Sequence, residues 1–200
     1  RCVNSSLLTL SSGSPSGGIY SGDGVSGNKF NPQTAGVGSH LITYSYSDIH
    51  GCSGFDTSTI RVLNAPVATF ATLSDVCVNT PAFALTGGNP TGGTYNGSGV
   101  SSGQFNPVAA GVGQYQLRYV FTDGSGCSDT AYSNQKVRTL PSVIFATLQP
   151  ACLNTPPFNL TGGTPAGGTY SGAGVNNAQF SPLVSGAGTF LLNYAFTDSF

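Results

Sequence analysis

The sequence has no Met, no Trp and no Glu, and only 6% of its 200 residues are charged. All seven acidic residues are Asp, and with six Lys and Arg the formal net charge is -1. So few basic side chains cannot neutralise a run of phosphates, so we expect no nucleic-acid partner. No apolar run reaches the roughly 18 residues that a membrane-spanning helix needs, so we do not expect a membrane-embedded protein.

Strong helix formers are also scarce, whereas residues typical of turns and strands are abundant, among them 29 Gly and 12 Pro. Disordered chains combine low hydrophobicity with high net charge. Here 38% of the residues are hydrophobic and 10% are aromatic. The composition therefore predicts a folded, all-β protein.

A repeat of 75 residues runs through the chain without insertion or deletion. The stretch GGIYSGDGV begins at Gly17, GGTYNGSGV at Gly92 and GGTYSGAGV at Gly167. Self-similarity at a fixed period predicts structural units in a row. We expect three of them: repeat 1 at 1–65 without its N-terminal strand, repeat 2 at 66–140 complete, and repeat 3 at 141–200 truncated at its C-terminal end.

The five cysteines follow the repeat. Cys2, Cys77 and Cys152 open the three copies, and Cys52 and Cys127 close the first two, each 50 residues after an opening cysteine. This spacing predicts one disulfide within each repeat, Cys2–Cys52 and Cys77–Cys127, with the partner of Cys152 outside the chain. Such a bond contributes roughly 4 kcal/mol by loop closure and indicates an extracellular or cell-surface location. The chain has no CxxC pair, so we expect no metal site and no cofactor.

The second copy has a clear alternation of apolar and polar residues over 114–121. Tyr115, Leu117, Tyr119 and Phe121 share one face, which predicts a half-buried antiparallel strand. Further strands are expected at 67–72, 83–86, 93–95, 104–105 and 131–138. About seven short strands per repeat fit tandem immunoglobulin-like β-sandwiches. Asn96-Gly97 predicts a type I′ hairpin turn.

No polar residue recurs as part of a catalytic arrangement. His40 aligns with Tyr115 and Phe190, which indicates an aromatic core position, and His50 aligns with Ser125 in a surface loop. A Ser-His-Asp arrangement needs a His that accepts a proton. We therefore expect no catalytic residue and predict that the protein is not an enzyme.

Two other residue types do recur at fixed places in the repeat. Each loop before a closing cysteine offers one carboxylate, which is too few for Ca²⁺ and favours an Asx turn. The aromatic residue of each GGxY stretch allows two interpretations, core packing or a stacking platform for sugars, and core packing is favoured. These residues are Asp48, Asp123 and Asp198, and Tyr20, Tyr95 and Tyr170.

The full repeat reads C-x-N-T-P-x-F-x-L-T-G-G-x-P-x-G-G-T-Y-x-G-x-G-V, followed by F-x-P, G-x-G and Y-x-F-T-D-x-x-G-C. In this pattern it resembles the tandem Ig-like or PKD-like repeats of very large secreted cell-surface proteins of Bacteroidota, including gliding-adhesin-like cargo of type IX secretion. The resemblance implies stalk or filament modules. It also implies an O-glycosylation site at Thr130, because Asp129-Thr130-Ala131 matches the acceptor pattern of such bacteria.

Two functions are open at this point. Identical spacing gives every joint between repeats the same geometry, so repeats or neighbouring copies can build an extracellular filament or a surface stalk. The alternative is an adhesin module that binds surface glycans or a protein through loops at 87–91 and 123–125.

Overall fold

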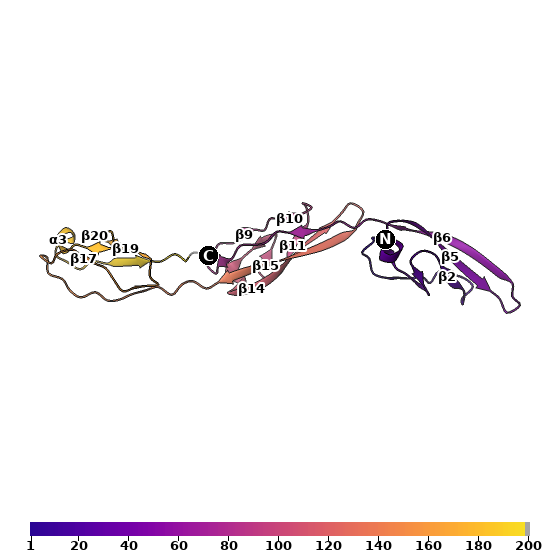
Figure 1. Ribbon diagram of the computed structural model, residues 1–200, viewed down its shortest axis with the longest axis horizontal. Coiled ribbons are helices and arrows are strands. Elements are labelled where there is room, and N and C mark those ends of the chain that lie inside the picture. The colour runs from indigo at the N-terminus through magenta and orange to yellow at the C-terminus, as the bar shows by residue number, and fades with distance from the viewer. Residues whose placement is uncertain (199–200) are drawn as a thin grey trace.

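The computed structural model describes residues 1–198 and shows an all-β protein with a single-turn helix in each repeat. The three repeats follow one another end to end along one direction (Figure 1). No sheet in the described residues combines strands from two repeats, so the repeat is also the unit of strand pairing.

The elements recur in the same order in each repeat. Repeat 1 contains β1 (Leu8–Thr9), β2 (Ile19–Ser21), β3 (Val25–Ser26), β4 (Lys29–Phe30), α1 (Pro32–Ala35), β5 (Gly38–Ser47) and β6 (Ser53–Val62). Repeat 2 contains β7 (Thr69–Phe70), β8 (Val76–Cys77), β9 (Phe83–Ala84), β10 (Gly88–Asn89), β11 (Thr94–Asn96), β12 (Val100–Ser101), β13 (Gln104–Phe105), α2 (Pro107–Ala110), β14 (Gly113–Thr122) and β15 (Ser128–Arg138). Repeat 3 contains β16 (Ile144–Phe145), β17 (Phe158–Asn159), β18 (Gly163–Thr164), β19 (Thr169–Gly172), β20 (Val175–Asn176), β21 (Gln179–Phe180), α3 (Pro182–Ser185) and β22 (Leu192–Ala195).

A long antiparallel hairpin dominates repeat 2. β14 and β15 pair from Gly113 with Val137 to Thr122 with Ser128, and β11 and β8 flank them in the order β11-β14-β15-β8. A second sheet has the order β12-β13-β9, and β10 pairs with β7. Repeat 1 has the corresponding sheets β2-β5-β6 and β1-β4-β3.

The core of repeat 2 lies between its two larger sheets. Leu117 of β14 and Val137 of β15 pack against Phe105 of β13, and all three are at most 1% exposed. The alternation predicted for 114–121 is confirmed, because Leu117 and Tyr119 are buried whereas Arg118 between them is exposed. Side chains of a strand point alternately to its two faces, so one face of β14 builds this core.

A buried tyrosine explains the second glycine of each glycine pair in the repeat. The hydroxyl of Tyr119 donates to the Pro90 carbonyl oxygen (2.5 Å) and accepts from the Gly93 N–H (2.7 Å). A Cβ atom at Gly93 would lie 2.4 Å from Cζ of Tyr119, and one at Gly88 would lie 2.5 Å from the same ring. Tyr44 and Tyr194 meet the equivalent glycines of the other repeats. The GGxPxGG stretch is thus a backbone cradle for one aromatic ring.

The type I′ turn predicted at Asn96-Gly97 is wrong. β11 and β12 belong to different sheets, so this dipeptide leads the chain from one sheet to the other. The two-residue hairpin turn instead joins β12 to β13 at Ser102 and Gly103, with φ values of 49° and 75°. Both residues have positive φ, which a type I′ turn requires.

The cradle predicts a strong effect of Gly93→Ala. The added methyl group would meet both the Tyr119 ring and the Val120 carbonyl oxygen, which lies 2.4 Å from the Cβ position. Because the backbone of β14 cannot move away, we expect a loss of about 3 kcal/mol in the unfolding free energy of repeat 2. Denaturant unfolding measures it.

Gly124→Ala is the matched control, because no atom lies within 4 Å of its Cβ position. Equal destabilisation by the two substitutions would contradict the cradle.

Candidate functional site: the joint between repeats

A disulfide crosses the joint between repeats 1 and 2. Cys2 and Cys127 are bonded, with an S–S distance of 2.04 Å and a Cα–Cα distance of 5.6 Å. Cys2 opens repeat 1 and Cys127 closes repeat 2. The predicted within-repeat pairs Cys2–Cys52 and Cys77–Cys127 are therefore wrong. Cys52, Cys77 and Cys152 are not disulfide-bonded in the described structure.

The length of the hairpin explains why the within-repeat prediction fails. Cys2 forms a parallel bridge with Leu63, just after β6 ends, whereas Cys52 directly precedes Ser53, where β6 begins. At about 3.3 Å per residue, that strand holds the two cysteines about 35 Å apart. A disulfide requires Cα atoms within about 7 Å of each other. The two cysteines of repeat 2 are separated in the same way by β15.

The opening cysteines are held by the same backbone contacts in both repeats. In repeat 1 the Val3 N–H donates to the Leu63 carbonyl oxygen (2.9 Å). In repeat 2 the Val78 N–H donates to the Arg138 carbonyl oxygen (2.9 Å). Each opening cysteine therefore lies beside the last residues of its own hairpin, at the end that faces the next repeat.

The closing cysteines lie on hairpin tips ordered by an aspartate. Oδ1 of Asp123 accepts from the Ser125 N–H (2.8 Å) and from the Cys127 N–H (2.9 Å). Asp48 accepts from His50 and Cys52 in the same way, both at 2.9 Å. The predicted Asx turn is confirmed. Residues 1–198 contain no group of three or more His, Cys, Asp or Glu that could hold a metal ion.

A second contact across the joint was not predicted from the sequence. The side-chain amide of Asn4 donates to the Ser128 carbonyl oxygen (2.9 Å), directly beside the disulfide. A visible signal was the Asn two residues after each opening cysteine, which recurs as Asn79 and Asn154. Its partner lies in another repeat, so the pattern within one repeat could not identify it.

The other recurring residues have structural places. His40 is buried, and its Nε2 lies 2.8 Å from the Gly36 carbonyl oxygen, so the predicted core position is confirmed. His50 is exposed. Tyr95 packs on Tyr119 with ring centroids 4.8 Å apart, and its hydroxyl accepts from the Gly88 N–H (2.9 Å). These contacts favour the core interpretation of the recurring tyrosines.

Thr130 lies on β15 opposite Val120 and is half-buried. The carboxylate of the preceding Asp129 accepts from the Ala68 N–H (2.8 Å), at the start of repeat 2. O-glycosylation of Thr130 stays a prediction.

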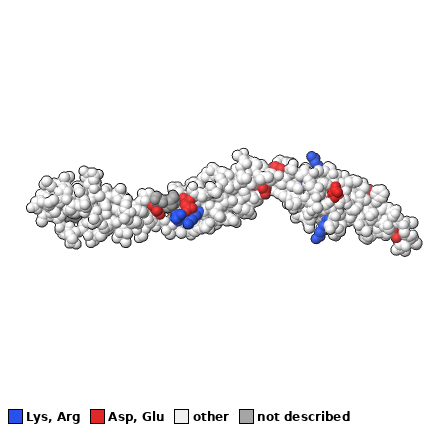
Figure 2. All heavy atoms as spheres, viewed as in Figure 1, with Lys and Arg blue, Asp and Glu red and all other residues white. Residues whose placement is uncertain are grey.

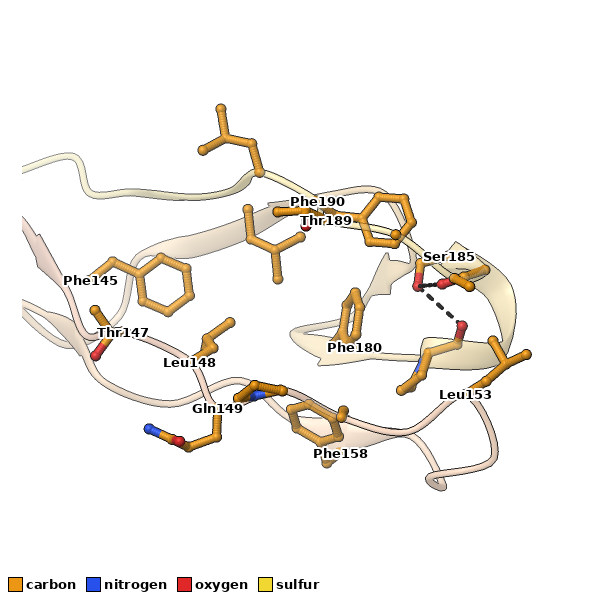
Figure 3. Close-up of a pocket in the computed structure, with 18 of the residues that line it drawn as sticks. Phe145, Thr147, Leu148, Gln149, Leu153, Phe158, Phe180, Ser185, Thr189 and Phe190 are labelled. Atoms are coloured by element: carbon orange, nitrogen blue, oxygen red, sulfur yellow. Dashed lines mark hydrogen bonds between the residues drawn. The ribbon is translucent and has the colours of Figure 1, made fainter.

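Repeat 3 contains a hollow of about 680 Å³ lined by Phe145, Phe158, Phe180 and Phe190. Figure 3 shows these rings arranged around the open space. In repeat 2 the corresponding space is filled by β15. There Val137 enters the core, and Nε2 of the fully buried Gln135 donates to the Ser74 carbonyl oxygen (2.8 Å). The hollow therefore has the position of a strand and not of a ligand pocket.

Charge contributes little to the surface. Figure 2 shows few charged side chains on the visible face, and they are scattered along it. Arg138 at the end of β15 forms an ion pair with Asp75 (2.5 Å).

None of the described helices is both long and apolar enough to cross a membrane. No protein-family model and no curated protein matches the chain.

The disulfide can be mapped directly, because each of the five cysteines lies in a different tryptic fragment. We expect non-reduced digests to contain fragment 2–29 linked to fragment 119–136, while fragments 30–61 and 62–118 are not linked to either. Mass spectrometry before and after reduction identifies the pairs. A link between fragments 2–29 and 30–61 would contradict the Cys2–Cys127 disulfide across the joint.

Proposed function

We propose that the chain is a structural repeat module of an extracellular filament or surface stalk, built from immunoglobulin-like or PKD-like β-sandwiches. The proposal rests on the disulfide that crosses the joint between repeats 1 and 2. Repeats 1 and 2 are connected twice, once by the linker at 64–66 and once by Cys2–Cys127. Two connections at separate points restrict bending far more than one linker does.

The two loops that the adhesin alternative predicts to bind a ligand have structural roles. The loop at 87–91 supplies Gly88 and Pro90 to the cradle of Tyr119. The loop at 123–125 belongs to the tip that carries Cys127 to the joint. Binding loops are normally free to vary on a rigid scaffold. Both assignments therefore favour the structural function over ligand binding.

The disulfide also changes how the chain carries tension. A force applied at the two ends passes from Cys2 to Cys127 through the sulfur atoms, so the 125-residue loop between them bears no load. Oxidising conditions outside the cell maintain such a bond. The low charge fits close lateral packing of chains, because repulsion between neighbours is weak. Secretion by a type IX system of Bacteroidota is part of this proposal through the resemblance of the repeats.

A rigid rod predicts a large radius of gyration. Repeats 1 and 2 are each spanned by strands of ten residues or more, and three repeats of that length sum to roughly 100 Å, which gives a radius of gyration of about 30 Å. A compact domain of this length has about 16 Å. Small-angle scattering of the purified chain measures the difference. A scattering profile of freely jointed beads would exclude a stiff stalk.

Single-molecule pulling from the two ends tests load bearing. We expect reduction to add about 430 Å of releasable contour length, because the 125 residues closed by the disulfide become extensible at about 3.5 Å each. The Cys2→Ser variant should show the longer extension without reductant, whereas Cys52→Ser should match the unmodified chain. Equal contour lengths with and without reductant would contradict load transfer through the Cys2–Cys127 disulfide.

A further inference from the structure

Asn4 joins the same two segments of the chain that the disulfide joins. It stands two residues after Cys2, and its side-chain amide donates to the carbonyl oxygen of Ser128 (2.9 Å), the residue that follows Cys127. The disulfide and this hydrogen bond therefore cross the first joint side by side. Since so few residues separate the two contacts, a chain that holds Asn4 at Ser128 also keeps the two sulfur atoms near each other.

The segment that carries Asn4 is shaped by repeat 1 alone. The Cys2 N–H donates to Oγ of Ser5 (3.1 Å), and the Ser5 N–H donates to the Cys2 carbonyl oxygen (2.9 Å). The Val3 N–H donates to the Leu63 carbonyl oxygen (2.9 Å), which ties this turn to the end of the β5–β6 hairpin. All of these partners lie in repeat 1, so the backbone at Asn4 is fixed before repeat 2 is in contact.

The same turn forms at two cysteines that have no disulfide. The Thr80 N–H donates to the Cys77 carbonyl oxygen (3.0 Å), and the Thr155 N–H donates to the Cys152 carbonyl oxygen (2.9 Å). Neither Cys77 nor Cys152 is disulfide-bonded in the described structure. The turn that presents the asparagine therefore does not depend on the disulfide.

The hairpin tip that carries Ser128 is equally independent of the bond. The Asp123 N–H donates to the Cys127 carbonyl oxygen (2.9 Å), and Oδ1 of Asp123 accepts from the Cys127 N–H (2.9 Å). Asp48 and Cys52 make the same two hydrogen bonds, both at 2.9 Å, although Cys52 is not disulfide-bonded. Each half of the joint is thus formed within its own repeat.

The carbonyl oxygen of Ser128 points to the outer edge of β15. Hydrogen-bonded and non-hydrogen-bonded pairs alternate along an antiparallel hairpin. Asp123 and Cys127 are hydrogen-bonded through their backbones, so the next pair, Thr122 and Ser128, directs its backbone groups away from the partner strand. The amide of Asn4 meets this outward oxygen from repeat 1.

We propose that Asn4 is a positioning residue for the Cys2–Cys127 disulfide: its hydrogen bond to Ser128 aligns the two preformed halves, so that the disulfide forms across the joint and resists reduction. Coupling between two contacts is reciprocal, so the hydrogen bond strengthens the disulfide by the same factor by which the disulfide strengthens the hydrogen bond. The inference goes beyond the proposed function and does not rest on it, because a stalk and an adhesin with this joint would have the same contact.

The alignment acts on an ordinary thiol–disulfide exchange. The thiols of Cys2 and Cys127 lose two protons and two electrons and form one S–S bond, while oxidised glutathione takes them up and becomes two molecules of reduced glutathione. The equilibrium constant of this exchange is an effective concentration, which rises when the two thiols of the chain are held in bonding geometry. Asn4 raises it without taking part in the exchange.

The test compares the Asn4→Ala variant with the unmodified chain in buffers of graded reduced and oxidised glutathione. Remaining thiols are trapped by acid and alkylated, and mass spectrometry quantifies the link between tryptic fragments 2–29 and 119–136. We expect the effective concentration to fall about five-fold, as for the loss of one neutral hydrogen bond, which raises the reduction potential by about 20 mV.

Asn79→Ala is the matched control, because Asn79 has the same place after Cys77, at the opposite end of β15 from the tip with Cys127. We expect this variant to keep the potential of the unmodified chain. Denaturant unfolding of the fully reduced chains separates alignment from stability. Asn4 and Ser128 are both exposed and their contact lies between repeats, so both variants should unfold at the same denaturant concentration as the unmodified chain.

Three results would overturn the proposal. The first is an unchanged potential in Asn4→Ala, and the second is an equal shift in Asn79→Ala. The third is a shift in Asn4→Ala that is matched by an equal loss of stability in the reduced chain, because Asn4 would then only support the fold of repeat 1. The potential is measured at one joint, so failure of the stiff rod in scattering would leave the difference between the variants unchanged.

Discussion

The continuous pairing of one long hairpin determines how repeats 1 and 2 are built and how they meet. β14 and β15 remain paired over ten residues, so the tip and the base of the hairpin lie at opposite ends of the repeat. The tip carries the closing cysteine, and the opening cysteine lies beside the base. A disulfide between these two positions of one repeat is excluded by distance. A bond from the base of one repeat to the tip of the next is the arrangement that the geometry permits.

Inside each repeat, the contacts of one aromatic ring connect strands that are too short to be held together by pairing alone. Most strands outside the hairpin have only two to four residues, and such short pairings stabilise little by themselves. Tyr119 connects them, because its ring lies against Gly88 and Gly93 and its hydroxyl bonds to the loop that contains Pro90. The high glycine content therefore has a packing reason, since a side chain at these positions would displace the ring.

The proposed function rests on the disulfide that crosses the joint between repeats 1 and 2. Unpaired thiols at Cys52 and Cys152 present, at the outer sides of repeats 1 and 3, the same two halves that are bonded between repeats 1 and 2. In the proposed filament or stalk, the bond at the first joint is a covalent connection that does not depend on the folding of any single sheet. The stabilisation from closing a loop of 125 residues is about 5 kcal/mol in the chain-entropy description. This is a large contribution for a repeat with so small a core.

Local patterns in the sequence were enough to predict the all-β class, the 75-residue period, the inner face of β14, the core position of His40 and the Asx turn at Asp123. Each of these depends on local periodicity, alignment between copies or turn chemistry, which residues near in sequence encode. The cysteine pairing, the contact of Asn4 with Ser128, and the position of the hairpin turn at Ser102-Gly103 instead of Asn96-Gly97 follow only from the arrangement of the chain in space. A spacing of 50 residues looks the same whether a strand brings two cysteines together or holds them about 35 Å apart, and only the direction of β6 and β15 in space distinguishes the two.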